Sequence, residues 1–192
     1  MGAFVVLILF TFPIWRKVFQ GRSSGPYPQA SDLQIEALSN IAKAADKGVA
    51  ATVYVGMLTS VPAPTAEQAT PSLPDAQSVR SGSFVGLDAV RVASGDVTLY
   101  RSTDGSLLLR FDKFSVTNGP QLRVYLSASD APKVAADMDV GGFSKFPVAF
   151  LKGTKGNQQY TTIPKELNVA RYKSVVIYSD ALNLVYAYAT FN

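Results

Sequence analysis

The chain has 192 residues, with 18 Lys and Arg against 14 Asp and Glu, and it contains neither histidine nor cysteine. The absence of these two residue types excludes a Ser-His-Asp or Cys-His nucleophile, a zinc finger and a cysteine-ligated iron–sulfur cluster. The formal net charge of +4 is too small to indicate nucleic-acid binding, and the hydrophobic content of 47% is that of a globular chain. We therefore expect a folded protein that is not an enzyme, binds no nucleic acid and holds no cofactor.

Residues 2–15 (GAFVVLILFTFPIW) form an uncharged apolar run that is followed by Arg16 and Lys17. As a helix this run is about 21 Å long, and extension to Phe19 approaches the roughly 30 Å of a bilayer core. The run lacks the polar face of a core helix, and it lacks the basic start and small-residue cleavage site of a signal peptide. We predict a membrane anchor over residues 1–19, with a cleaved signal peptide and a buried core helix as alternatives.

The basic residues after the apolar run bear on the orientation of this anchor. By the positive-inside rule, Arg16, Lys17 and Arg22 would keep the following chain in the cytoplasm. We expect instead that a few basic residues precede Met1 in the complete protein. The predicted location is therefore the cell membrane, crossed once, with the rest of the chain on the extracytoplasmic side.

Residues 20–59 are predicted to be a linker with a short helical segment. Ser31 and Gln34 have the spacing of a capping box, for a helix that would end near Gly48. Residues 49–59 (VAATVYVGMLT) fit both the helical and the strand period. We favour a helix there, with Val49, Val53 and Met57 on one face.

A linker with four prolines over residues 60–79 leads into a region of different character, residues 80–192. Short runs rich in Val, Leu, Phe and Tyr recur there, at 84–93, 96–102, 106–116, 121–129, 146–153, 158–163, 173–179 and 183–191. Asp104-Gly105 predicts a tight hairpin, and Gly95-Asp96 and residues 118–120 predict further turns. Apolar and polar residues alternate in several runs, as in antiparallel sheets buried on one face, and 175–178 fits a central strand. We predict an all-β domain, an antiparallel β-sandwich, with a closed barrel as the alternative.

Several motifs of this domain occur in the order found in one known family. Residues 117–127 (TNGPQLRVYLS) resemble the TNGP-x-L-x-V-Y-L-S segment of the DM-thirteen domain, a relative of DOMON domains that is described as an electron-transfer module. Residues 151–164 resemble its LKG…G…Q-x-Y-x-IP stretch, and residues 172–178 resemble its Y-x-SVVIY strand. The apolar N-terminus and single domain are similar to bacterial membrane-anchored members. The candidate residues that carry the resemblance are Thr117, Asn118, Gly119, Pro120, Lys152, Gly153, Gly156, Gln159, Tyr160, Pro164, Tyr178 and Ser179.

The position after the SVVIY strand departs from the family. The family usually has a cysteine there, on which its redox role largely rests, and this chain has Ser179. A serine hydroxyl is neither a practical one-electron donor nor a soft metal ligand. We therefore expect a domain that acts in binding or protein interaction at the cell envelope, with electron transfer, as the resemblance implies, as the alternative. The expected partners are the membrane, through the N-terminal helix, and an envelope protein or an anionic polymer.

The matched residues also have structural interpretations. Asn118 and Gly119 tolerate the left-handed backbone of a turn, and Gly153 and Gly156 would bracket a hairpin tip. The two matched tyrosines, Tyr160 and Tyr178, would pack their rings inside and keep their hydroxyls at the edge.

Three further groups of residues carry charge or a motif. The basic residues of the last third of the chain could form a face for an anionic partner. Lysines on edge strands and hairpin tips also serve against aggregation, which is the alternative interpretation. These basic residues are Lys145, Lys152, Lys155, Lys165, Arg171 and Lys173. Asp130, Asp137 and Asp139 could bind a hard cation such as calcium, but their spacing lacks the twelve-residue loop pattern and favours a solvated loop. Residues 153–156 match a GXXG loop of RNA-binding KH domains, yet strand-like runs flank them, so no RNA site is predicted.

Overall fold

A computed structural model describes residues 47–59, 65–66, 75–142 and 144–192. The predicted membrane anchor at residues 1–19 and the predicted capping box at Ser31 and Gln34 lie outside this part of the chain. Within it, no helix combines the length and the apolar character that crossing a bilayer requires.

The segment after Asp46 forms one helix, α4 (Lys47–Thr59), which confirms the helix favoured for residues 49–59. Gly48, where we expected a helix to end, lies instead in the first turn of α4. The predicted helical face is the one that packs, because Val53 is fully buried and Val49 and Met57 lie against the core of the domain. The helix is therefore held by tertiary contacts with the sandwich.

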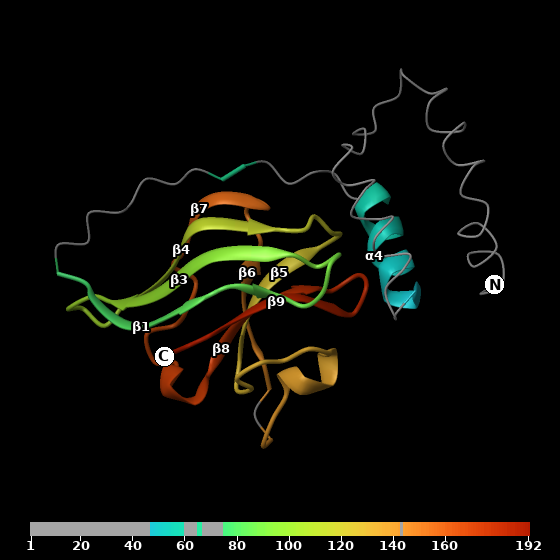
Figure 1. The fold of residues 1–192 in the computed structure, drawn as a ribbon. Coiled ribbons are helices and arrows are strands. Elements are labelled where there is room, and N and C mark those ends of the chain that lie inside the picture. The colour runs from blue at the N-terminus through green and yellow to red at the C-terminus, as the bar shows by residue number, and fades with distance from the viewer. Residues whose placement is uncertain (1–46, 60–64, 67–74, 143) are drawn as a thin grey trace, which may run out of the picture.

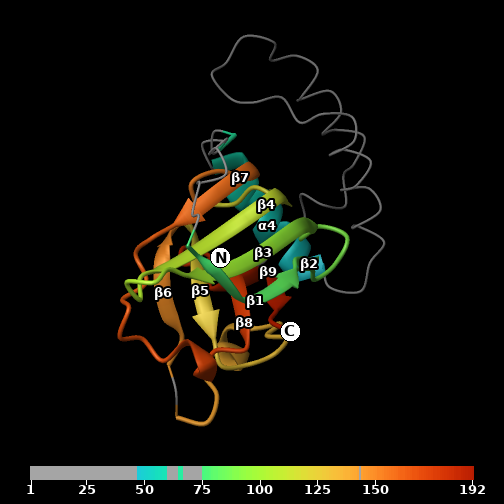
Figure 2. The same cartoon turned by 90° about the vertical axis from the view of Figure 1, so that its left-hand side faces the viewer.

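Nine strands follow in the described residues: β1 (Gln77–Ser83), β2 (Val85–Gly86), β3 (Ala93–Arg101), β4 (Leu107–Val116), β5 (Leu122–Ser127), β6 (Phe146–Phe150), β7 (Lys155–Tyr160), β8 (Ser174–Ser179) and β9 (Leu184–Thr190). They form two antiparallel sheets. The first sheet has the order β1-β3-β4-β7, and the second has the order β2-β9-β8-β5-β6. No strand pairing among the described residues joins one sheet to the other, so the domain is the predicted β-sandwich and not a closed barrel (Figures 1 and 2).

The core lies between the two sheets. At its centre, Phe111 lies with its ring centroid 4.8 Å from that of Phe84, 5.0 Å from that of Phe114 and 5.3 Å from that of Tyr160. All four side chains are buried, and ring contacts of this kind, edge-on for Phe84 and tilted for Phe114 and Tyr160, add to the free energy gained from their burial.

Two predicted features are confirmed, one in the second sheet and the other at the hairpin between β3 and β4. Residues 175–178 belong to β8, which lies between β9 and β5 and is buried at all six residues. Asp104-Gly105 joins β3 to β4, where Gly105 has a φ of +82° and the Asp104 carboxylate accepts hydrogen bonds from the backbone N–H and hydroxyl of Ser106.

The expectation that each sheet is buried on one face alone was wrong for the second sheet. Its outer face carries a cluster of buried residues, in which Met138 of the short 3-10 helix η1 (Ala135–Met138) packs against Tyr125 and Val176. The loop that contains η1 therefore covers part of this face, which alternation along single strands does not reveal.

The predicted strand over 84–93 with a turn at Gly95-Asp96 was wrong. Only β2 pairs with β9 in this stretch, and β3 runs through Gly95 without turning. Gly95 lies at a register shift between β3 and β4 and has a φ of +104°. A side chain at Gly95 would also approach the backbone of Phe114 to 2.6 Å. The glycine marks a β-bulge, not a turn.

The predicted hairpin tip between Gly153 and Gly156 was also wrong. The strand before these residues, β6, belongs to the second sheet, and the strand after them, β7, belongs to the first. Gly156 lies within β7 and has a φ of +98°. The segment is a crossing between the sheets, which requires the same turn-forming residues as a hairpin.

Candidate functional site

Ser179, at the position of the family's cysteine, is the last residue of β8 and is fully buried. Its hydroxyl donates a hydrogen bond of 2.6 Å to the carbonyl oxygen of Pro120 and accepts one of 3.2 Å from the N–H of Leu182. These two bonds connect the turn before β5 with the turn after β8. The hydroxyl therefore has a structural role at this position.

The turn before β5 is built differently from our prediction. Asn118 and Gly119 do not have a positive φ, and the left-handed residue is Gln121, with a φ of 47°. Gly119 is required for another reason, since a Cβ at this position would lie 2.4 Å from the hydroxyl oxygen of Tyr186. Tyr186 is fully buried, and its hydroxyl has no hydrogen-bond partner among the residues that the structure describes.

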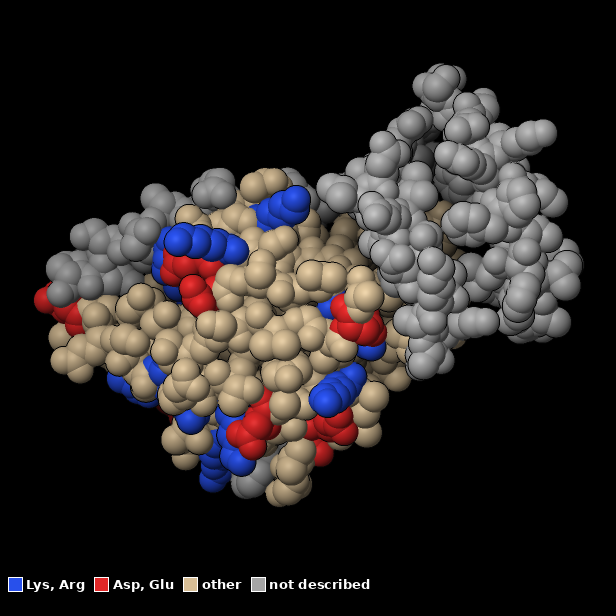
Figure 3. Space-filling model, viewed as in Figure 1, with Lys and Arg blue, Asp and Glu red and all other residues tan. Residues whose placement is uncertain are grey.

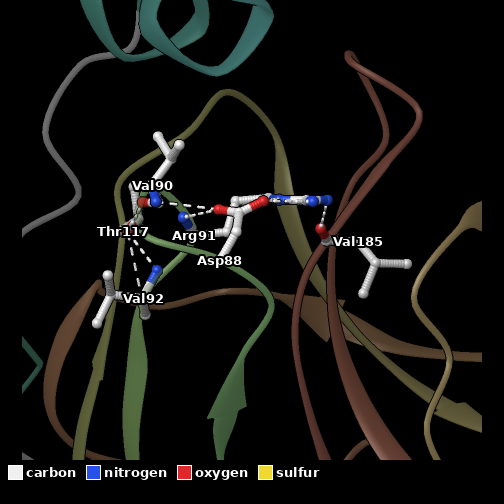
Figure 4. A network of polar contacts seen from close by, with 6 residues as sticks. All are labelled: Asp88, Val90, Arg91, Val92, Thr117 and Val185. Carbon is white, nitrogen blue, oxygen red and sulfur yellow. Dashed lines mark hydrogen bonds and ion pairs between the residues drawn. The ribbon is translucent and has the colours of Figure 1, made fainter. Parts of the chain in front are cut away.

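Thr117, the first residue of the motif, holds the loop between β2 and β3 (Figure 4). Its hydroxyl donates a hydrogen bond of 2.6 Å to the carbonyl oxygen of Val90 and accepts one of 3.0 Å from the N–H of Val92. Its own N–H donates to the carbonyl oxygen of Val92. The motif threonine is thus a structural residue of this end of the sandwich.

The same loop is attached to β9 through Arg91 (Figure 4). The Arg91 guanidinium forms an ion pair of 2.6 Å with the Asp88 carboxylate and donates a hydrogen bond of 2.8 Å to the carbonyl oxygen of Val185. Partial burial acts to raise the pKa of Asp88, but hydrogen bonds from Arg91 and Val90 and the charge of Arg91 lower it below its ordinary value. The carboxylate is therefore ionised at neutral pH and fixes the guanidinium.

A group of polar and aromatic side chains gathers on the outer side of the second sheet where β8 ends. We call it the β8-end patch and define it by Arg123, Tyr125, Phe150, Tyr178 and Asp180. The Tyr125 hydroxyl donates a hydrogen bond of 2.7 Å to Asp180, and the Arg123 Nε lies 3.2 Å from the other oxygen of that carboxylate. The Tyr178 ring meets the Tyr125 ring edge-on, with centroids 5.7 Å apart.

Phe150 is the most exposed member of the patch, at 57% of its surface, and the Arg123 guanidinium lies 4.1 Å from its ring centroid. The Tyr178 hydroxyl donates to the side-chain oxygen of Asn183. Burial, with the hydrogen bond to Asp180, raises the pKa of Tyr125 to about 12. The patch therefore combines an exposed ring, a guanidinium held by a carboxylate and a phenol that donates a hydrogen bond to the same carboxylate.

The motif residues around β7 form a separate group in the first sheet. The Tyr160 hydroxyl donates 2.6 Å to the side-chain oxygen of Gln158, whose amide donates 2.6 Å to the carbonyl oxygen of Gly153. Tyr160 is 1% exposed, so its hydroxyl is internal and not at the edge as predicted. The Lys152 ammonium donates to the carbonyl oxygen of Gln159. These bonds fix the crossing between the sheets.

The remaining candidate of this group, Pro164, is exposed in the loop after β7, where its carbonyl oxygen accepts a hydrogen bond from Leu167. The structure thus brings Thr117 to Pro120 together with Ser179 but leaves the β7 group apart from them. The patch residues Arg123, Tyr125, Phe150 and Asp180 were not among our candidates. A sequence signal existed for three of them, because Asp180 directly follows the cysteine position and Arg123 and Tyr125 lie within the matched segment 117–127.

The predicted basic residues are distributed over several elements. Lys145 is paired with Asp139 at 3.1 Å, and Lys173 is paired with Asp130 at 3.4 Å. On the face shown in Figure 3, basic and acidic residues are interspersed. The acidic loop residues have separate partners, since the Asp137 carboxylate accepts from the backbone of Lys133 and Val134. Lys155 and Gly156, from the GXXG match, lie in β7.

A family description, electron transfer DM13, matches residues 83–191, which is more than half of the chain. The chain belongs to the DM13 family. This confirms the resemblance drawn from the motifs. The DM13 match begins at the last residue of β1 and leaves out α4. No curated protein and no solved structure matches the chain significantly.

Proposed function

We propose that this DM13 protein is a non-enzymatic, membrane-anchored protein whose sandwich domain lies outside the cytoplasmic membrane and binds a partner protein at the cell envelope. The exposed Phe150 ring with the Arg123 guanidinium over it is the observation that carries the proposal. Aromatic residues and arginine are enriched among the residues that dominate protein interfaces.

The patch is also ordered before any partner arrives. Arg123 lies between the Asp180 carboxylate and the Phe150 ring, and Tyr125 holds Asp180 from the other side. Side chains that are already fixed lose little conformational entropy on binding, so more of the contact energy remains as affinity.

The anchor is supported by the apolar run at residues 2–15 and is tested by fractionation of cells that produce the full-length protein. We expect the protein in the membrane fraction, resistant to extraction with carbonate, and degraded by protease added to cells whose outer layers have been opened. Recovery from the soluble cytoplasmic fraction would contradict the proposal.

The interaction is tested by photo-crosslinking in the native host with benzoylphenylalanine at position 150. The control carries the same group at position 92, since Val92 is exposed to 56% and Phe150 to 57%. We expect a discrete adduct from position 150 that weakens when Arg123→Ala is added. Identical adducts from positions 150 and 92 would refute a specific interface at the patch.

A second candidate function is one-electron transfer, which the family description names. It is favoured by the contact between the Tyr125 hydroxyl and Asp180, next to the family's cysteine position. In the step we envisage, the Tyr125 phenol gives one electron to an external high-potential one-electron oxidant and its proton to the Asp180 carboxylate, which leaves a neutral phenoxyl radical. Return of one electron and of that proton restores the phenol. Tyr178 is close enough to exchange the electron with Tyr125.

Protein-film voltammetry distinguishes this second candidate from the first. We expect a one-electron wave that Tyr125→Phe abolishes and that Asp180→Asn moves to higher potential, because the proton acceptor is lost. Tyr188→Phe, which changes a partly buried tyrosine near the same face, serves as the control. A wave that survives in Tyr125→Phe would rule out this route.

A further inference from the structure

A groove of about 430 Å³ lies at the outer edge of the first sheet, away from the β8-end patch. One side is formed by β1 and the end of β3, and the other by the short 3-10 helix η2 (Val169–Arg171) and the residues before it. We call it the β1–η2 groove and define it by its lining residues, Val79, Arg80, Arg101, Leu167, Asn168, Val169 and Ala170. The patch and the groove have no residue in common.

The shape of β1 brings apolar and basic side chains to the groove. The register between β1 and β3 shifts between Ser78 and Arg80, so that Val79 is the extra residue of a bulge. A bulge twists an edge strand and re-aims its side chains. Val79 is 41% exposed and lines the groove with Leu167 and Val169.

Arg80 is held in place from two sides. One of its guanidinium nitrogens donates a hydrogen bond to the carbonyl oxygen of Tyr172, and its Cζ lies 5.4 Å from the ring centroid of Phe191. A guanidinium has five N–H donors, so these contacts leave donors for a further acceptor. Arg80 is half-buried, as is Arg101.

The two groove arginines are not used in ion pairs of the described residues. Those ion pairs involve the basic residues Arg91, Arg110, Arg123, Lys145 and Lys173. Two half-buried guanidinium groups in one groove repel each other and attract an anion. Guanidinium geometry matches a carboxylate well, because its two parallel N–H groups can bind both oxygens.

We propose that the β1–η2 groove binds a small organic carboxylate, with the carboxylate on Arg80 and Arg101 and an aliphatic body on Val79, Leu167 and Val169. The volume suits a molecule of modest size. This binding site is independent of the proposed protein interface, and each can fail without the other.

Three probes separate the contributions of charge and apolar contact. Hexanoate carries both groups, acetate carries the charge alone, and hexan-1-ol carries the aliphatic body alone. Binding is followed by NMR on the ¹⁵N-labelled full-length protein, from the backbone amides of residues 79–80 and 167–170. We expect saturable shifts with hexanoate, at least tenfold weaker binding of acetate, and no saturable shifts of these amides with hexan-1-ol.

The variants test which residues hold the charge. We expect Arg101→Gln to weaken hexanoate binding about tenfold or more, and Arg80→Gln to do the same. Lys133→Gln, in an exposed loop of the other sheet, should leave the affinity unchanged. Unchanged amide signals of the second sheet in the Arg101→Gln protein show that the fold is intact.

The proposal is overturned by any of three results. These are the absence of saturable shifts with hexanoate, equal affinity of the wild type and the Arg101→Gln variant, and equal shifts with hexan-1-ol and hexanoate. Crosslinking from position 150 uses other residues, so its result supports or contradicts the protein interface alone.

Discussion

Two buried tyrosines use their hydroxyl groups in opposite ways. Tyr160 donates to Gln158 and accepts a hydrogen bond from the N–H of Lys152, whereas the Tyr186 hydroxyl has no partner in the described part of the chain. Burial raises the pKa of both, and that of Tyr186 reaches about 12. A buried hydroxyl without a hydrogen bond reduces stability, because its hydration is lost and not replaced.

This contrast predicts opposite effects for the same substitution. Tyr160→Phe should lower the free energy of unfolding by about 1–3 kcal/mol, because the Gln158 oxygen loses its donor. Tyr186→Phe should leave it unchanged or raise it by about 1 kcal/mol. Urea unfolding followed by circular dichroism measures both. Equal losses in the two variants would show that the Tyr186 hydroxyl has a partner.

Gly119 gives a second prediction at this scale. A methyl group there would meet the Tyr186 hydroxyl oxygen at 2.4 Å and the ring carbon behind it at 2.6 Å. We expect Gly119→Ala to cost about 1–3 kcal/mol through overpacking. Tyr186→Phe in the same chain should restore part of that loss, with a coupling of about 0.5 kcal/mol or more in a double-mutant cycle. Additive losses would place the strain elsewhere.

At the residue scale, the sequence indicated which positions matter better than why they matter. The TNGP motif identified Gly119 correctly as a special position, but the cause is a tyrosine on β9 that no local pattern connects to it. Ser179 was likewise singled out as a departure from the family. That its hydroxyl bridges two turns depends on the pairing of β5 with β8, which is a tertiary fact.

At the scale of elements, α4 is attached to the domain by its buried face. Val53 is fully buried, whereas Val55, one half-turn further along the same helix, is 49% exposed. We expect Val53→Ala to lower the free energy of unfolding by about 1–2 kcal/mol and Val55→Ala to change it by less than about 0.5 kcal/mol.

The comparison uses the same substitution in the same helix, so helix propensity cancels. Urea unfolding of the full-length protein measures both variants. Equal losses would mean that helix propensity and not contact with the sandwich determines the effect, and α4 would then not belong to the core.

Elements that depend on the residues within one segment were predicted from the sequence, whereas elements that depend on which strands pair with each other were not. The hairpin at Asp104-Gly105 and the central position of β8 follow from residues within each segment. The bulge at Gly95 and the crossing before β7 depend on which strand lies opposite, and a glycine in a turn looks the same as a glycine in a bulge.

For the whole molecule, the shifted pKa values predict how stability depends on pH. The pKa of Asp88 is lowered in the fold, so its contribution is present above the ordinary value near 4 and is lost as the pH falls further. The pKa values of Tyr125 and Tyr186 are raised to about 12. Their contribution is complete below pH of about 10 and is lost as the pH rises towards 12.

We therefore expect a plateau of the free energy of unfolding between about pH 5 and 9, with losses on both sides. Urea unfolding at a series of pH values measures it. Asp88→Asn should make the acid side shallower, and Tyr186→Phe should make the alkaline side shallower. An acid side that is unchanged in Asp88→Asn would assign the acid sensitivity to other carboxylates.

The overall architecture was predictable, because short apolar runs separated by turn residues are compatible with few folds, chiefly a β-sandwich or a closed barrel. A sandwich and a closed barrel share the same local pattern, and only the pairing at the sheet edges separates them. The β8-end patch and the β1–η2 groove gather residues from distant segments, so neither could be assembled from sequence alone.

The pairing of β1 with β3 bears on how the protein can be shortened. The DM13 match starts at Ser83, so a fragment cut to the family's limits would lose nearly all of β1 and uncover the backbone of β3 from Val97 to Arg101. An uncovered strand of this kind is a template for pairing with other molecules. Such a fragment would retain every family motif and yet be prone to self-association.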